Sequence, residues 1–133
     1  MPPDELVFFV DRSLGRRYVA EALKALGLGL KVEIHDDHFP LDASDEEWLS
    51  EVGKRNWVVL TKDKRVRKIA LEREALLRAG VRAFVLTTGN LQGPEMARVF
   101  VSHRKRIIHL ARTRAAPFIA GVTRSGVRLY PRS

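Results

Sequence analysis

The chain has 133 residues, of which 45% are hydrophobic and 30% are charged, a balance typical of soluble globular proteins. This length allows one domain with a substantial core, so we expect residues 1–133 to form a single domain. The lack of cysteine excludes disulfide bonds and thiolate metal ligands. No apolar run approaches the ~18 residues of a membrane span, and Met1–Glu5 does not open a secretory signal. We therefore expect a cytoplasmic protein with no membrane partner.

Charge is distributed unevenly along the chain. The formal net charge is +8, which favours polyanionic partners such as RNA. Half of the carboxylates lie between Glu33 and Glu51, a stretch without Lys or Arg, whereas Arg98–Arg114 contains six basic residues and no acid. A concentrated acidic region within a basic chain is typical of metal-dependent enzymes that act on phosphodiesters. It is also compatible with simple solvated faces.

The first predicted strand is Leu6–Val10, an unbroken apolar run that Asp11 closes. A helix follows, with Ser13 as its expected N-cap and apolar residues recurring every three or four positions. Lys31–His35 is the second predicted strand and leads into a polar loop. The spacing His35-x-x-His38 suggests a transition-metal site in this loop. The alternative is that both histidines are solvated, which is more common when two histidines flank two aspartates in a loop.

The second predicted helix begins with an acidic turn. Ser44 and Glu47 fit the Ser-x-x-Glu capping box, which explains Glu47 structurally. Asp45 precedes Trp48 and Leu49 by three and four residues, so we expect it on the face that packs against the sheet. A carboxylate on a buried face needs a partner, and a cation is one.

The central predicted strand is Trp57–Leu60, because an unbroken apolar run suits a strand that is covered on both faces. Asp63 stands just beyond its carboxyl end, where ligands collect in open α/β sheets. We therefore expect Asp63 to be a metal ligand beside a polyanion-binding patch; the alternative is a turn aspartate that caps the next helix. The expected RNA-binding residues are Arg12, Lys62, Lys64, Arg65, Arg67 and Lys68.

Strands and helices continue to alternate in the second half of the chain. The expected elements are a helix over Lys64–Ala79, a strand over Val81–Thr87, a long helix from Pro94, and a hairpin of Phe118–Val122 with Val127–Tyr130. The long helix carries the basic Arg98–Arg114 face, for which RNA or an acidic partner is the functional interpretation. This alternation predicts an α/β layered fold with a mainly parallel central sheet.

Three carboxylates are expected to meet at one edge of that sheet. Asp11 and Asp63 each follow an apolar strand, and Asp45 opens a helix between them. Several carboxylates suit Mg²⁺ or Mn²⁺, because these ions prefer oxygen ligands. Such an ion can activate water and stabilise charge on a phosphodiester. Asp11, Asp45 and Asp63 are therefore our candidate catalytic and metal-binding residues.

Three segments resemble the acidic blocks of PIN-like domains: Phe-Phe-Val-Asp11, Ser44-Asp45-Glu46-Glu47-Trp48-Leu49 and Val-Val-Leu-Thr-Lys-Asp63-Lys. PIN-like domains are Mg²⁺/Mn²⁺-dependent ribonucleases that include the VapC-type toxins of prokaryotic toxin–antitoxin pairs. The resemblance spans about Leu6 to Asn90, and the terminal hairpin resembles one subgroup. It implies a single three-layer domain, an RNA substrate and an acidic antitoxin partner, and it allows a homodimer. It also implies metal binding by the three aspartates, with Glu46 or Glu47 as helpers.

The chain departs from the family pattern after Asp63. Many relatives carry a further acid there, whereas here the next residues are basic and Asn90 is the only late polar ligand. Our principal hypothesis is a metal-dependent ribonuclease that acts as the toxin of a toxin–antitoxin pair. The alternative is a non-catalytic RNA- or antitoxin-binding module with a degenerate acidic site. A receiver-like phosphoacceptor domain fits less well, because Arg12 follows Asp11 where a second acid is expected.

Overall fold

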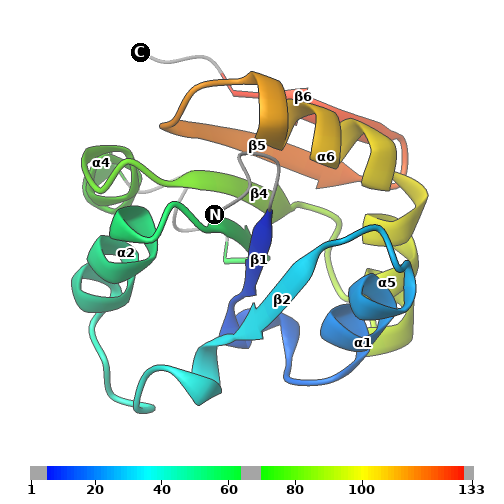
Figure 1. Ribbon diagram of the computed structural model, residues 1–133, viewed down its shortest axis with the longest axis horizontal. Helices are drawn as coiled ribbons and strands as arrows, with labels where there is room; N and C mark the ends of the chain where they lie inside the picture. Colours follow the sequence, from blue (N-terminus) through cyan, green and yellow to red (C-terminus); the bar gives the residue numbers. More distant parts are fainter. Residues whose placement is uncertain (1–5, 64–69, 131–133) are drawn as a thin grey trace.

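The structure, a computed structural model, describes residues 6–63 and 70–130 (Figure 1). Its strands are β1 (Val7–Val10), β2 (Lys31–Ile34), β3 (Val58–Thr61), β4 (Arg82–Leu86), β5 (Phe118–Thr123) and β6 (Gly126–Leu129). Its helices are α1 (Tyr18–Ala25), α2 (Asp45–Lys54), α4 (Ala70–Arg78), α5 (Gly93–Ser102) and α6 (Arg104–Thr113). Two short 3₁₀ turns, η1 (Arg12–Leu14) and η2 (His35–Asp37), follow β1 and β2.

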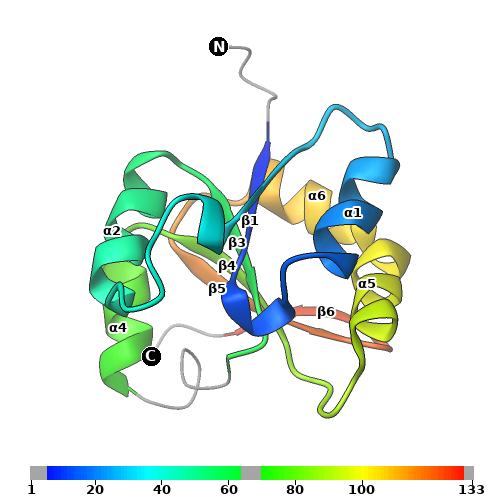
Figure 2. The same cartoon turned by 90° about the horizontal axis from the view of Figure 1, so that it is seen from below.

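All six strands form one sheet in the order β2-β1-β3-β4-β5-β6. The strands β1 to β5 are all parallel to one another, and β6 closes the predicted hairpin by running antiparallel to β5. Helices α2 and α4 cover one face, and α1, α5 and α6 cover the other (Figure 2). The predicted three-layer α/β fold with a mainly parallel sheet and a C-terminal hairpin is therefore confirmed.

The unbroken apolar runs are explained by a core on each face of the sheet. In β1, Phe8 and Val10 pack toward α1, α5 and α6, whereas Phe9 packs toward α2 and α4. Phe9 stacks on Trp48 and Trp57, with ring centroids 5.6 and 6.0 Å away. Because alternate side chains of a strand point to opposite faces, a strand between two helical layers needs apolar residues at every position.

Two predicted helices differ from the observed ones. Ser13 does not cap α1, since it lies in η1 and α1 begins only at Tyr18. The long helix expected from Pro94 is divided into α5 and α6 at His103, whose φ of −106° and ψ of 17° are not helical. His103 Nε2 donates a hydrogen bond to the Arg124 carbonyl oxygen at 3.0 Å, which ties this junction to the β5–β6 turn. No helix in residues 6–63 and 70–130 is long and apolar enough to cross a membrane.

Candidate active site

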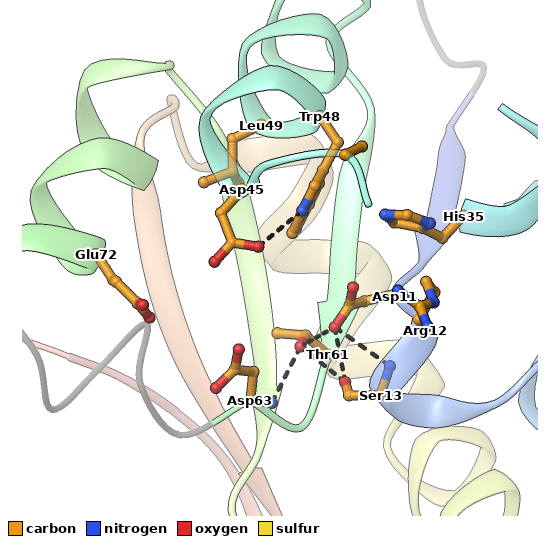
Figure 3. A pocket seen from close by; sticks show the side chains of 11 residues that line it. Asp11, Arg12, Ser13, His35, Asp45, Trp48, Leu49, Thr61, Asp63 and Glu72 are labelled. Carbon is orange, nitrogen blue, oxygen red and sulfur yellow. Dashed lines mark hydrogen bonds between the residues drawn. The ribbon is translucent and has the colours of Figure 1, made fainter. Parts of the chain in front are cut away.

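A pocket of about 180 Å³ lies at the carboxyl ends of β1 and β3 (Figure 3). Its lining residues are Asp11, Arg12, Ser13, His35, Ala43, Asp45, Trp48, Leu49, Thr61, Asp63 and Glu72. The structure thus brings the three predicted aspartates to one pocket, although their chemical roles stay predictions. The strand register explains part of this arrangement, because Val10 pairs with Leu60 and so places Asp11 beside Thr61.

Asp11 is held by two hydroxyl groups and is only 8% exposed. Its Oδ2 accepts hydrogen bonds from Ser13 Oγ at 2.7 Å and from Thr61 Oγ1 at 2.8 Å. The same hydroxyl oxygens accept backbone N–H groups, Ser13 from Lys62 at 3.1 Å and Thr61 from Asp63 at 3.0 Å. Asp11 is therefore fixed to the chain around Asp63, while its other oxygen points into the pocket (Figure 3).

Asp45 enters the pocket from the first turn of α2. Its Oδ1 accepts a hydrogen bond from Trp48 Nε1 at 3.0 Å, as their spacing on one helix face allows. The expectation of a buried carboxylate was wrong, since Asp45 is exposed at the open side of the pocket. Glu46 and Glu47 are also exposed but do not line the pocket, because each further helical residue turns by about 100°. Ser44 Oγ accepts from the Glu47 N–H at 3.2 Å, which confirms the predicted N-cap.

Glu72 is a fourth carboxylate of the pocket, and the sequence analysis missed it. It lies in the first turn of α4 and points toward Asp45 and Asp63 (Figure 3). Four residues later, Leu76 is fully buried at 0% exposure, so Glu72 shares the inward face of the helix. A prediction that placed Leu76 on the inward face of this helix would have placed Glu72 there too, because the two residues are four positions apart.

His35 forms part of the pocket wall and is only 4% exposed. Its ring packs against Phe39 and Trp48, with centroids 5.4 and 5.7 Å away. Burial lowers the pKa of His35 from its ordinary 6.5, and Asp11 opposes this effect by favouring the imidazolium. His38 points elsewhere, since its Nε2 lies 2.8 Å from Glu33 Oε2. The two histidines that suggested a transition-metal site thus have different partners, and in the described part of the chain no group of three His, Asp or Glu side chains could hold a metal ion.

Sequence comparison assigns the chain to a known family. The sequence model of the PIN-like domain matches residues 6–88, which is more than half of the chain. The chain belongs to the PIN-like family. The match contains β1 to β4 and thus every segment that lines the pocket. A Mycobacterium tuberculosis protein named "Putative ribonuclease VapC45" is 29% identical over 113 residues, which are 84% of this chain and 81% of that protein. No solved structure matches the chain.

The basic residues predicted to bind RNA are only partly described in this PIN-like domain. Arg12 lines the pocket but is also engaged structurally, since its Nε lies 3.5 Å from Asp36 and its Nη1 donates to the Leu41 carbonyl oxygen at 3.0 Å. Lys62 is exposed. Lys64, Arg65, Arg67 and Lys68 lie outside the described residues. Asn90 does not line the pocket but belongs to an adjoining cavity at the ends of β3 and β4.

The donor set of this PIN-like domain suits a hard divalent cation. Asp11, Asp45, Asp63 and Glu72 offer carboxylate oxygens to one pocket, the ligand type that Mg²⁺ and Mn²⁺ prefer. Within the described ranges, no three His, Asp or Glu side chains are close enough together to hold one ion. Mg²⁺ sites in enzymes commonly use one or two carboxylates together with waters and substrate phosphates. The residues present therefore fit such an ion by their chemistry.

Proposed function

We propose that this PIN-like domain is an endoribonuclease that depends on Mg²⁺ or Mn²⁺. The observation that carries the proposal is the gathering of four carboxylates at one pocket, where the strands β1 and β3 end. Asp11, Asp45 and Asp63 would hold the ion together, one or two of them directly and the rest through its waters, with Glu72 as a further ligand to those waters. The relative named as a ribonuclease supports RNA as the substrate.

Each carboxylate has a distinct part in this proposal. Asp11 is the fixed member, because two hydroxyl groups orient it and leave one oxygen toward the pocket. Asp45 is exposed and held by one indole N–H, so it receives the cation from solvent. When bound, the ion supplies a Lewis acid that activates water and stabilises charge on the scissile phosphodiester. Without a cation, neighbouring carboxylates repel one another.

We further propose that this ribonuclease is the toxin of a toxin–antitoxin pair, and that its antitoxin binds through an acidic segment. The charge of α5 and α6 supports an acidic partner. Both helices carry basic residues, and the chain has no acid from Met96 onward. Lys105, Arg106 and Arg112 are exposed on α6. In Figure 2, α6 lies toward the amino ends of the strands, away from the pocket. This surface would therefore bind parts of an RNA, or an acidic partner, at a distance from the cut.

The test combines RNA cleavage with metal-dependent melting. Asp11→Asn, Asp45→Asn and Asp63→Asn should each lose more activity than the ~10–100-fold typical of residues that only support metal ligands. Each should also reduce the rise in melting temperature that Mn²⁺ causes by binding the folded state. Asp42→Asn, an exposed acid outside the pocket, is the matched control and should behave like the natural protein. If Asp63→Asn keeps both the cleavage and the melting shift, the proposed site is wrong.

The alternative is a module that binds RNA without cutting it. One observation favours it, namely that no three acidic or histidine side chains in the described ranges come together as an ion site. The same experiment separates the two functions. A non-catalytic module would bind RNA equally well with Mn²⁺ or EDTA and would leave the RNA intact in both, whereas the ribonuclease would cut only when Mn²⁺ or Mg²⁺ is present.

A further inference from the structure

A second and larger cavity adjoins the carboxylate pocket. We call it the β4 groove; it is lined by Ser13, Lys62, Asp63, Leu86, Thr88–Leu91 and Met96. Ser13 and Asp63 also line the pocket, so the two cavities share a wall. The groove measures about 500 Å³, within the ~300–1,000 Å³ of sites that hold small organic ligands, whereas the pocket is smaller at about 180 Å³. With the proposed cation among its carboxylates, the pocket has room for a phosphate group, and the groove has room for a larger unit attached to it.

The wall of the β4 groove combines three kinds of chemistry. Lys62 provides an exposed cation beside the shared Asp63. Thr88 and Asn90 provide a hydroxyl and an amide, which can donate and accept hydrogen bonds. Leu91 and Met96 provide apolar surface, and a thioether packs well against aromatic rings. A nucleotide presents matching parts: an anionic phosphate, a polar base edge and a flat aromatic face.

The loop that forms one side of the groove is anchored at both ends. The Thr87 N–H donates to the Val122 carbonyl oxygen at 2.9 Å, which ties the end of β4 to β5. At the other end, a capping box joins Gln92 and Glu95 and starts α5. Asn90 has a φ of 56°, a left-handed conformation that asparagine adopts more readily than most residues. An anchored loop can hold a base-reading side chain in place.

We propose that the β4 groove is a subsite for one unstacked base of a single-stranded RNA, next to the scissile phosphate in the pocket, and that Asn90 reads the edge of this base. The inference rests on the proposed function, since the pocket places the phosphate. In an RNA duplex the bases are stacked and paired, whereas unpaired bases can be splayed out and bound individually. The groove therefore selects single-stranded RNA and makes cleavage depend on one base at a fixed position.

The test compares two asparagines that share a backbone conformation. Asn90→Gly removes the amide from the groove, and glycine keeps a positive φ without strain. Asn56→Gly is the matched control, because Asn56 has a φ of 59° but precedes β3 at the opposite end of the strand. Cut sites in a random single-stranded RNA pool are sequenced for both variants and for the natural protein. We expect Asn90→Gly to reduce the base preference at one flanking position by about tenfold, and Asn56→Gly to leave it unchanged.

Binding measurements keep this proposal testable apart from catalysis. Fluorescence anisotropy in EDTA would compare labelled single-stranded homopolymers with a duplex of the same length. The natural protein should favour one homopolymer over the others and over the duplex, and Asn90→Gly should lose that preference. Cleavage without any base preference, or a preference unchanged in Asn90→Gly, would overturn the subsite while leaving the ribonuclease intact. A preference in binding without cleavage would instead overturn the proposed catalytic function alone.

Discussion

At the scale of single residues, the carboxylates of the pocket differ in how firmly the protein holds them. Asp11 is nearly buried and accepts hydrogen bonds from Ser13 and Thr61, whereas Asp45 is exposed and accepts one from Trp48. A group that is already oriented loses little freedom when it binds an ion, so Asp11 is the natural fixed point of the site. Exposed carboxylates can adjust to the ion and to the substrate.

Glu72 offers the sharpest single-residue test of this pocket. Glu72→Gln removes one negative charge from the pocket, so it should weaken Mn²⁺ binding and reduce the Mn²⁺-induced rise in melting temperature by about half or more. Glu74→Gln on the same helix is the control, because Glu74 points outward and lies 4.0 Å from Arg78 Nη2. Differential scanning fluorimetry with and without Mn²⁺ measures both variants. Equal shifts for the two variants would exclude Glu72 from the metal site.

His35 should make the stability of the fold depend on pH. Its pKa is lowered from 6.5 mainly by burial, so the unfolded chain binds the proton more readily than the folded protein. The stability that neutral His35 contributes is therefore complete above about pH 6.5 and is lost as the pH falls below that value. Urea unfolding measures the free energy of unfolding at each pH. Between about pH 7.5 and pH 5, this free energy should fall more steeply for the natural protein than for His35→Leu. The exposed His109→Gln should follow the natural protein; parallel curves for all three proteins would contradict this prediction.

At the scale of elements, α2 and α4 present their carboxylates in the same way. Asp45 in α2 lies four residues before buried Leu49, and Glu72 in α4 lies four residues before buried Leu76. Near their far ends the two helices approach closely at Gly53, where a Cβ atom would lie 2.0 Å from the Ala79 carbonyl oxygen. This contact sets the distance between the helices, and through it the width of the pocket.

Gly53→Ala should therefore destabilise the protein, although a helical Gly→Ala change ordinarily stabilises by about 0.5–1 kcal/mol. The added methyl group meets backbone rather than a movable side chain, and such overpacking costs roughly 1–3 kcal/mol. Chemical denaturation of both proteins shows whether the substitution raises or lowers the free energy of unfolding. Ser50→Ala, at an exposed position of the same helix, is the control and should be neutral or slightly stabilising. A stabilising Gly53→Ala would show that α2 and α4 are not held at this contact.

At the scale of the whole molecule, the acidic pocket and the basic helices occupy different regions. Nine Lys or Arg residues and no acid occur from Met96 to the end of the chain. In Figure 1, α5 and α6 lie on the opposite side of the sheet from α2, which carries Asp45. A long RNA could therefore contact the basic helices while one of its phosphates reaches the pocket. In the proposed function, the attraction to polyanions and the chemistry would therefore belong to different regions of the molecule.

RNA affinity should consequently depend steeply on salt. Each phosphate contact with single-stranded RNA contributes a slope of about −0.7 to the logarithm of affinity against the logarithm of salt concentration. Replacing Lys105, Arg106 and Arg112 by Gln should reduce the slope by about 2 if all three contact phosphates. Fluorescence anisotropy in EDTA measures binding without cleavage. In the control variant, the exposed Lys24 of α1 and Lys54 of α2 are replaced by Gln. This variant should show the same salt slope of RNA affinity as the natural protein. A flat salt dependence would show that these helices do not bind RNA.

The sequence by itself determined the buried parallel strands and the acids at their carboxyl ends. This was possible because strand polarity and apolar continuity are local properties, so Asp11 and Asp63 had to emerge at one edge once β1 and β3 were recognised. The capping residue Ser44 fixed the start of α2, and with it the place of Asp45.

Only the tertiary structure decided which further residues meet these aspartates. Ser13 was predicted as a helix cap, but its hydroxyl donates to Asp11 and accepts the Lys62 N–H, which the register of β1 and β3 brings beside it. Glu72 depends on the phase of α4 against the sheet, which Leu76 sets. The division between α5 and α6 depends on the carbonyl of Arg124, which is 21 residues beyond His103. Local periodicity shows which face of an element is apolar, but the partners of its polar residues are distant in the chain, and only packing selects them.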